Sequence, residues 1–322
     1  MSLRALIPFG LMVGISSYAT LDTVAAQSID LDSLARQEHA LLQETLCPAP
    51  GTPALNFAEL FDPQLQRMEP ARVFDNLYVL GMRTVVAWAL QTSDGIILFE
   101  SMFAHNVEDT IVDGLGKLGL DPSEIRYVII SHGHADHFGG ARFLQEAFGA
   151  RVVMSERDWE FMHEAPLRGA PPPFPRKDIA VRDGYAITLG DTRVELYLTP
   201  GHTPGTLSSV FPVRDGGNVH YVGYLGGSGI PRTPEDILRF MASADRFARV
   251  DDRIDTYVSN HPMVDGTLLK LEALAGRRPG DPHPFVFGNA GFRASISVLH
   301  DCAGEILERR LADVPARPDD AG

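Results

Sequence analysis

Two kinds of hydrophobic pattern alternate along the chain and predict a fold built from strands and helices. Short apolar runs between turn residues are typical of strands, whereas apolar residues spaced three and four apart are typical of helices. After residue 76 three strand-like runs follow one another at 77–80, 84–88 and 95–99. The turn at 93–95, Ser-Asp-Gly, separates the last two runs. This spacing predicts an opening antiparallel meander.

Strand-like and helical segments then alternate to the end of the chain. Further strands are expected at 127–130, 151–154, 185–189, 194–198, 207–213, 219–225 and 256–259. Helices are expected at 31–42, 107–118, 141–148, 156–163, 234–250, 268–275 and 294–310. Strands followed by helices, repeated twice, predict an α/β fold of two halves, each a sheet with helices on its outer face.

The N-terminus has the pattern of a secretory signal peptide. Arg4 precedes an apolar stretch at 5–18, and small residues at 24–26 stand before Gln27. A membrane anchor or a buried helix is less favoured, because Pro and Gly interrupt the run and a span needs about 20 continuous apolar residues. We therefore expect residues 1–26 to direct export to a periplasm or to the exterior.

Residues 27–71 mix helical patterning with prolines and predict an N-terminal extension that lies on the domain formed by residues 72–322. The domain itself ends in a helical extension. The chain has two cysteines, Cys47 and Cys302. Export would place them in an oxidising compartment, so we expect them to form a disulfide, with two free buried thiols as the alternative.

The charge balance bears on the partners of the protein. A formal net charge of −14 and the lack of a basic run disfavour nucleic acid, which is bound through clustered Lys and Arg. We expect a small-molecule substrate, no nucleic-acid partner, and no stable membrane insertion once the signal peptide is removed.

A proline-rich segment at 166–176 cannot be an interior helix or a central strand. It contains three consecutive prolines, 171–173, followed by Phe174. We expect a surface loop, which is either a plain connection between the two halves or a wall of a substrate cleft.

The most distinctive pattern comes directly after the predicted strand at 127–130. There His132, His134, Asp136 and His137 form a His-x-His-x-Asp-His sequence. A strand end that enters a tight turn can present several side chains to one point, and imidazole nitrogen and carboxylate oxygen are ligands that zinc accepts readily. The pattern predicts a metal site.

Two more histidines follow predicted strands in the same way. His202 lies in a Gly-His-Thr-Pro-Gly segment after the strand at 194–198, and His261 follows the strand at 256–259. Functional sites of α/β folds gather at the carboxyl ends of strands. We expect both histidines to join the metal site.

These residues resemble the signature of the metallo-β-lactamase superfamily: His-x-His-x-Asp-His, then a Gly-His turn, then a final His after a late strand. The resemblance spans about residues 72–275. It implies an αββα sandwich of two mixed sheets with two zinc ions at one edge. The ligands it implies are His132, His134 and His202 for the first zinc, and Asp136, His137 and His261 for the second.

The sequence departs from many members of that superfamily where they carry an Asp that bridges both metals. The corresponding stretch, residues 221–229, has no carboxylate. In this the chain is similar to the subclass of metallo-β-lactamases whose first zinc has three histidines and whose second has Asp-His-His, without a bridging Asp or Cys. Glyoxalase-type thioesterases, tRNA-processing nucleases and typical lactonases normally keep the Asp, so these classes are less favoured as the function of the chain. Flavodiiron oxidoreductases have Glu in place of His134, so di-iron redox chemistry is also less favoured.

A second departure is Glu100, at the end of the predicted strand 95–99, where the family usually has Asp. Glu100 either supports the metal ligands through a hydrogen bond or is a solvated residue at a strand end.

The resemblance implies a hydrolase that cleaves an amide or ester bond of the β-lactam type with a metal-bound hydroxide. Asp136 would orient the hydroxide, and Tyr224 or Ser228 would donate to the oxyanion, with structural roles for both as the alternative. No Lys or Arg stands at an obvious carboxylate-binding position, so the substrate is left open. The second hypothesis is a periplasmic lactonase, an esterase or another non-lactam metallo-hydrolase of the same fold. A metal-binding protein without turnover is the third.

Overall fold

The computed structural model describes residues 28–49, 52, 56–164 and 171–312. The predicted signal peptide, residues 1–26, lies outside the described residues, and so does the 166–170 part of the proline-rich loop. None of the helices within these ranges is long and apolar enough to cross a bilayer.

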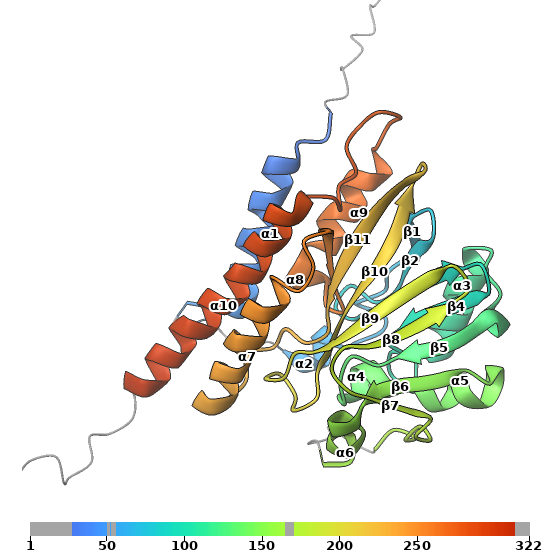
Figure 1. Cartoon of the computed structure of the whole chain (residues 1–322), viewed down its shortest axis with the longest axis horizontal. Coiled ribbons are helices and arrows are strands. Elements are labelled where there is room, and N and C mark those ends of the chain that lie inside the picture. Colours follow the sequence, from blue (N-terminus) through green and yellow to red (C-terminus); the bar gives the residue numbers. More distant parts are fainter. Residues whose placement is uncertain (1–27, 50–51, 53–55, 165–170, 313–322) are drawn as a thin grey trace, which may run out of the picture.

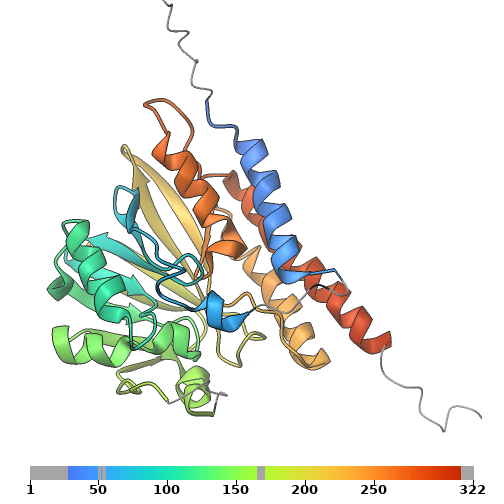
Figure 2. The same ribbon diagram turned by 180° about the vertical axis from the view of Figure 1, so that it is seen from behind.

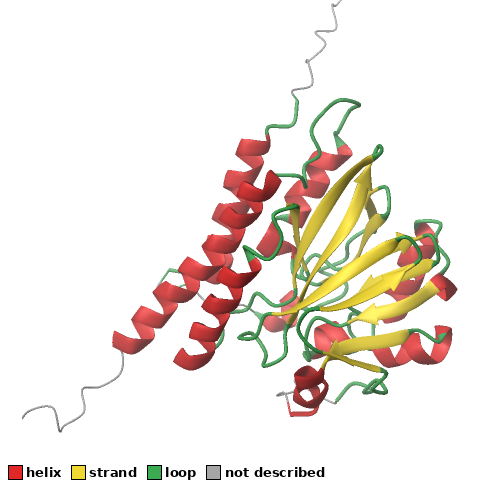
Figure 3. Cartoon of the chain, viewed as in Figure 1, coloured by secondary structure: helices red, strands yellow, loops and turns green. Residues whose placement is uncertain are grey.

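The first half of the chain forms one sheet and the second half forms another, and the two pack face to face between helices (Figure 1; Figure 3). The first sheet follows chain order and contains β1 (Ala71–Phe74), β2 (Leu77–Gly81), β3 (Val86–Thr92), β4 (Gly95–Phe99), β5 (Ile125–Ile129), β6 (Arg151–Ser155) and β7 (Ile179–Val181). Its strands are antiparallel from β1 to β4 and parallel from β4 to β7.

The second sheet has the strand order β12-β11-β10-β9-β8. Its strands are β8 (Tyr185–Leu189), β9 (Thr192–Leu198), β10 (Leu207–Asp215), β11 (Asn218–Leu225) and β12 (Ile254–Ser259). Only the β11–β12 pair is parallel. Both sheets are therefore mixed, and the predicted αββα sandwich is confirmed.

Two groups of helices cover the outer faces of the sheets. The first sheet is covered by α3 (Asp113–Lys117), α4 (Ala135–Phe138), α5 (Ala141–Phe148) and α6 (Glu156–Glu164). The second sheet is covered by α1 (Leu31–Leu46), α7 (Pro234–Phe247), α8 (Pro262–Asp265) and α10 (Gly288–Ala312). The remaining helices are α2 (Phe57–Leu60) and α9 (Thr267–Ala275).

Strands buried on both faces explain the continuous apolar runs in the sequence. In β4, Ile96 and Leu98 pack against the helices of the first group, whereas Ile97 and Phe99 pack between the two sheets. Successive side chains of a strand point to opposite faces, so such a strand must be apolar at every position.

The N-terminal extension packs on the domain through α1, which lies beside α10 (Figure 1; Figure 2). Leu42 is buried against the second sheet's helices. The buried Glu38 carboxylate lies 2.9 Å from the buried Lys270 ammonium. The predicted disulfide is present: Cys47, at the end of α1, is bonded to Cys302 in α10.

The structure differs from the predicted elements in small ways. Strands β1 and β7 were not expected, because four and three residues are too few to show a period. The expected helix at 107–118 is divided into a π-helical turn, Glu108–Val112, and α3.

The described part of the proline-rich loop packs onto the helices of the first sheet. The Phe174 ring stacks on Phe138, with centroids 5.7 Å apart, and lies 4.3 Å from the His163 ring. The Gln145 side chain also donates to the Arg176 carbonyl at 2.8 Å. These contacts hold Phe174 and Arg176 against the helices of the first sheet, and both alternatives for the 166–176 loop stay predictions.

Reduction of the disulfide should lower the free energy of unfolding by about 2–4 kcal/mol, because the bond closes a loop spanning 255 residues of sequence in the unfolded chain. Denaturant unfolding with and without reductant measures the change. The Cys47→Ser/Cys302→Ser double variant is the control, since its stability should not respond to reductant. Two titratable thiols in protein purified from an oxidising compartment would contradict the expectation.

Candidate metal centre

Strands β5, β9 and β12 end at the same edge of the sandwich, and each leads into a segment that carries a predicted ligand. Backbone hydrogen bonds join the residues after β5 and β12 to strands of the opposite sheet. The Leu207 amide donates to the Ser131 carbonyl at 2.8 Å, and the Val86 amide donates to the Asn260 carbonyl at 2.9 Å. The edge therefore collects residues that are far apart in sequence.

Local backbone geometry presents four ligands from one short segment. His134 is extended, with φ −91° and ψ 148°, and it caps the single helical turn α4. Residues 131–133 form a bend before it, and His132 and His134 both contribute a ligand atom to one group. The helical turn then places Asp136 and His137 beside them. The compact sequence spacing thus becomes a compact cluster.

The first group brings together the three histidines that the sequence predicts. The Nε2 atom of His202 lies 3.2 Å from His132 Nε2 and 3.2 Å from His134 Nδ1. The ligand atoms of His132, His134 and His202 all lie within 4.8 Å of one another.

Hydrogen bonds on the other ring nitrogens decide which atoms face the group. His132 Nδ1 lies 2.7 Å from the Gly226 carbonyl oxygen, and His202 Nδ1 lies 2.7 Å from the Gly229 carbonyl oxygen. A carbonyl only accepts, so each Nδ1 carries a proton and each neutral ring has its lone pair on Nε2. Two lone pairs 3.2 Å apart repel unless a cation lies between them. This donor arrangement fits a bound metal.

The second group contains Asp136, His137 and His261, whose ligand atoms also lie within 4.8 Å of one another. His261 Nδ1 lies 2.7 Å from the Thr84 carbonyl oxygen, which leaves the Nε2 lone pair for the group. His137 is buried, yet neither of its ring nitrogens makes a hydrogen bond within the described residues. Buried polar atoms normally find a partner, so an orphaned imidazole fits a metal ligand.

The pKa directions fit neutral nitrogen donors in the first group and a positive charge in the second. Burial lowers the pKa of His132 well below its usual value and that of His202 to about 3, so both rings are neutral donors. Burial also acts to lower the pKa of His137, but the carboxylates of Asp136 and Glu100 outweigh it and raise the pKa to about 10. Burial acts to raise the pKa of Asp136, and the charge of His137 reverses this and lowers it. A carboxylate beside buried imidazoles favours a cation in the second group.

Comparison with known proteins points to a family. The family described as "Metallo-beta-lactamase superfamily" matches residues 81–216. A subclass B3 metallo-beta-lactamase of Bradyrhizobium japonicum is similar at 27% identity and a TM-score of 0.67, covering 77% of this chain and 96% of that one. Residues 81–216 match the metallo-beta-lactamase superfamily, and the chain has the fold of a subclass B3 member. A metallo-beta-lactamase from Legionella gormanii shares the fold, with 23% identity and a TM-score of 0.69. The match covers 76% of this chain and 98% of that one.

Curated relatives in the superfamily match a shorter stretch. A hydroxyacylglutathione hydrolase of Acidiphilium cryptum is 34% identical over 124 residues, which is 34% of this chain and 46% of that protein. An N-acyl homoserine lactonase of Bacillus thuringiensis is 33% identical over 116 residues, which is 35% of this chain and 43% of that protein. The chain thus spans less than half the length of these relatives.

A buried carboxylate joins the two loops that hold the first group of ligands. Asp158, in α6, accepts from the Gly133 amide at 2.8 Å, the Thr203 hydroxyl at 2.6 Å and the Gly205 amide at 2.7 Å. Gly133 lies between His132 and His134, and Thr203 and Gly205 follow His202. Asp158 therefore fixes the distance between the loops, a role that no motif in the sequence indicated.

Tyr224 differs from the expectation that it would donate to an oxyanion. It is 1% exposed, and its ring packs against Phe99 between the sheets, with centroids 5.3 Å apart. Its hydroxyl donates to Glu100. Because the proton is already engaged in the interior, the structure does not place Tyr224 as a donor to substrate.

Ser228 and Glu100 are both buried beside the ligand groups. Ser228 is 2% exposed and lies between Gly227 and Gly229. A Cβ on Gly229 would lie 2.8 Å from His202 Cε1, so only glycine allows the backbone this close to the ring. The oxyanion role of Ser228 stays a prediction.

Glu100 is 0% exposed, so the prediction of a solvated residue at a strand end is wrong.

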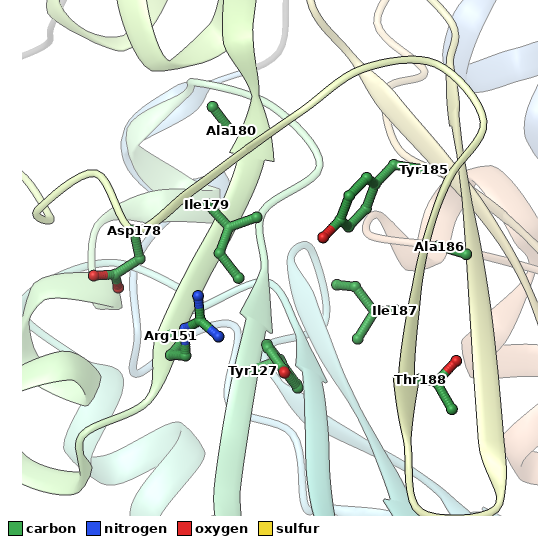
Figure 4. Close-up of a pocket in the computed structure, with 9 residues that line it drawn as sticks. All are labelled: Tyr127, Arg151, Asp178, Ile179, Ala180, Tyr185, Ala186, Ile187 and Thr188. Atoms are coloured by element: carbon green, nitrogen blue, oxygen red, sulfur yellow. The ribbon is translucent and has the colours of Figure 1, made fainter.

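A pocket of about 390 Å³ lies away from these ligands, at the open edge between the two sheets (Figure 4). Tyr127 and Arg151, from the starting halves of β5 and β6, line one wall, and Tyr185 of β8 lines the other. The candidate metal ligands follow the opposite, carboxyl ends of the strands, and none of them lines this pocket.

Each ligand group should hold one metal ion, so that the purified protein carries about two zinc ions per chain. His202→Ala should lose the ion of the first group and His261→Ala that of the second, each leaving about one. His300→Ala is a matched control, because this histidine lies in α10 and belongs to neither group. Elemental analysis after dialysis measures the content, and unchanged zinc in both ligand variants would refute the grouping.

Asp158→Asn should lower the free energy of unfolding by about 1–3 kcal/mol. One carboxylate oxygen becomes an NH2 group, so at least one of the three donors, Gly133, Thr203 and Gly205, loses its acceptor. The first metal group should also bind zinc more weakly. Asp113→Asn is the control, since Asp113 is exposed in the first turn of α3. Denaturant unfolding with and without zinc gives both effects, and equal stabilities for the two variants would show that Asp158 is not a joint between the loops.

Proposed function

We propose that the chain is an exported dinuclear zinc hydrolase that opens the amide bond of a β-lactam. The observation that carries the proposal is the makeup of the two ligand groups, three histidines in one and Asp-His-His in the other. The stretch in which many superfamily members carry a bridging Asp gives this centre backbone carbonyls instead. Gly226 and Gly229 accept from the rings of His132 and His202.

The donor set supports zinc. Five imidazoles and one carboxylate suit a borderline-soft dication that has no preference for a fixed geometry. Two zinc ions at these groups would supply a water nucleophile at neutral pH and polarise the scissile carbonyl.

The residues of the chain prepare the site for this chemistry. Backbone carbonyls hold three of the imidazoles in the tautomer that presents a lone pair. Asp136 is ionised and 17% of its side chain is exposed, so one oxygen can ligate while the other accepts from an attacking water. The carboxylate thereby orients the nucleophile toward the carbonyl carbon.

The likeness to solved structures favours a β-lactam over other acyl substrates. The subclass B3 enzyme of Bradyrhizobium japonicum is matched over 96% of its length, whereas the curated relatives are matched over less than half of theirs. A net charge of −14 also disfavours anionic phosphodiesters.

The second candidate function is hydrolysis of a lactone, a thioester or a simple ester. The names of the curated relatives, an N-acyl homoserine lactonase and a hydroxyacylglutathione hydrolase, support it. The same two metal groups would serve either reaction, because both begin with attack on an acyl carbon.

We further propose that the protein acts in a periplasm or outside the cell. The signal-like pattern of residues 1–26 supports export, and the Cys47–Cys302 disulfide supports an oxidising compartment.

The zinc-loaded protein should hydrolyse a chromogenic cephalosporin and be inactive on bis(p-nitrophenyl) phosphate. The panel also includes an N-acyl homoserine lactone, a glutathione thioester and p-nitrophenyl acetate. Asp136→Ala should lower kcat/KM by at least about 100-fold by removing both a ligand and the orienting group, whereas Asp113→Ala should not. Turnover of only lactone or ester would make the second candidate correct. Phosphodiesterase activity without acyl hydrolysis would overturn both.

A further inference from the structure

The turn that follows β4 has an unusual backbone. Glu100 has φ +66° and Met102 has φ +62°, in the left-handed region that residues other than glycine disfavour. The turn holds the backbone of a metal ligand. The Ser101 amide and the Ser101 hydroxyl each donate to the His137 carbonyl at 2.8 Å, and the Gly140 amide donates to Met102 at 3.1 Å.

The Glu100 side chain reaches the ring of the same ligand. Its Oε2 lies 3.6 Å from His137 Nδ1 and accepts from the Ser131 amide at 3.3 Å. On the other side of the ring, His137 Nε2 lies 3.2 Å from Asp136 Oδ2, within the second ligand group. A carboxylate at one ring nitrogen orients an imidazole so that the other nitrogen meets the metal.

Two residues from the second sheet hold this carboxylate in place. The Tyr224 hydroxyl donates to Glu100 Oε1, and the Asn260 amide lies 3.4 Å from the same oxygen. Asn260 also donates to the Ser131 hydroxyl at 3.1 Å and to the Gly226 carbonyl at 2.9 Å. The carboxylate is thus fixed between both sheets, directly behind the second ligand group.

We infer that Glu100 and Tyr224 form one positioning unit that orients His137 and sets the affinity of the second group for its metal. Tyr224 belongs to the stretch where a bridging carboxylate is absent, and it contributes to the metal centre from behind, through Glu100. The longer Glu side chain in place of Asp needs this hydroxyl because its extra methylene adds a rotatable bond. The inference rests on the two-metal site of the proposed function.

Tyr224→Phe tests the unit by removing only the hydroxyl. The affinity of the second metal should fall about 10-fold or more, while that of the first stays within about 2-fold. Tyr257→Phe is a closely matched control: Tyr257 lies on the neighbouring strand β12, is 1% exposed, and its hydroxyl has no hydrogen-bond partner in the described structure. Stepwise zinc competition against a chromophoric chelator gives both affinities, and cobalt spectra report the geometry of the second group.

Glu100→Gln and the Glu100→Gln/Tyr224→Phe pair test whether the residues act together. Glu100→Gln should weaken the second metal, and adding Tyr224→Phe should weaken it little more, because both changes act through one contact to His137. Independent losses that multiply, or wild-type affinities in Tyr224→Phe, would overturn the unit. A loss equal to that in Tyr257→Phe would also do so.

Failure of the proposed function gives a different result. In one outcome two metals bind and the variants change the metal affinity of the second group as expected, while no β-lactam is hydrolysed. That result would support the positioning unit and contradict the substrate assignment. If the wild-type protein binds no second metal, both fall.

Discussion

Three hydrogen bonds from imidazole N–H groups to backbone carbonyls set the chemistry of the whole site. His132, His202 and His261 each place Nδ1 2.7 Å from a carbonyl oxygen, that of Gly226, Gly229 and Thr84, respectively. Each bond fixes a tautomer and directs a lone pair into a ligand group. Two of the carbonyls follow β11 in the second sheet, and the third precedes β3 in the first. His132 and His261 each bond to a carbonyl of the opposite sheet, so these two donors are oriented only when the sandwich is closed.

Closing the sandwich buries polar groups that must be paired, and the same pairs give the site its rigidity. A buried polar group without a partner is costly, and a buried charge more so. Asp158 meets this demand with three donors from two ligand loops, and Glu100 meets it with donors from both sheets. A buried polar group that has no hydrogen bond within the described residues indicates a place where another partner is needed. Among those residues His137 Nε2 makes no hydrogen bond and faces Asp136, so a cation at this position would satisfy it.

The sequence predicts well what depends on local pattern and less well what depends on distant contacts. Strands such as β4 are predictable because they are buried on both faces, and the candidate ligands are predictable because four of them lie within six residues. Tyr224 shows the limit: its position in the chain suggested a donor to substrate, but its partner, Glu100, is 124 residues away. Asp158 gave no signal, since one Asp in a helix resembles a solvated residue until the fold surrounds it.

The most direct test of the account is anomalous diffraction at the zinc edge from crystals of the zinc-loaded protein. Two peaks are expected, one bound by Nε2 of His132, Nδ1 of His134 and Nε2 of His202, the other by Asp136, His137 and His261. The ligand atoms of His132 and His202 follow from the tautomers that the carbonyls impose, and that of His134 follows from its position 3.2 Å from His202 Nε2. A single peak, or a metal bound to Nδ1 of His132 or His202 with the Gly226 and Gly229 contacts broken, would contradict it.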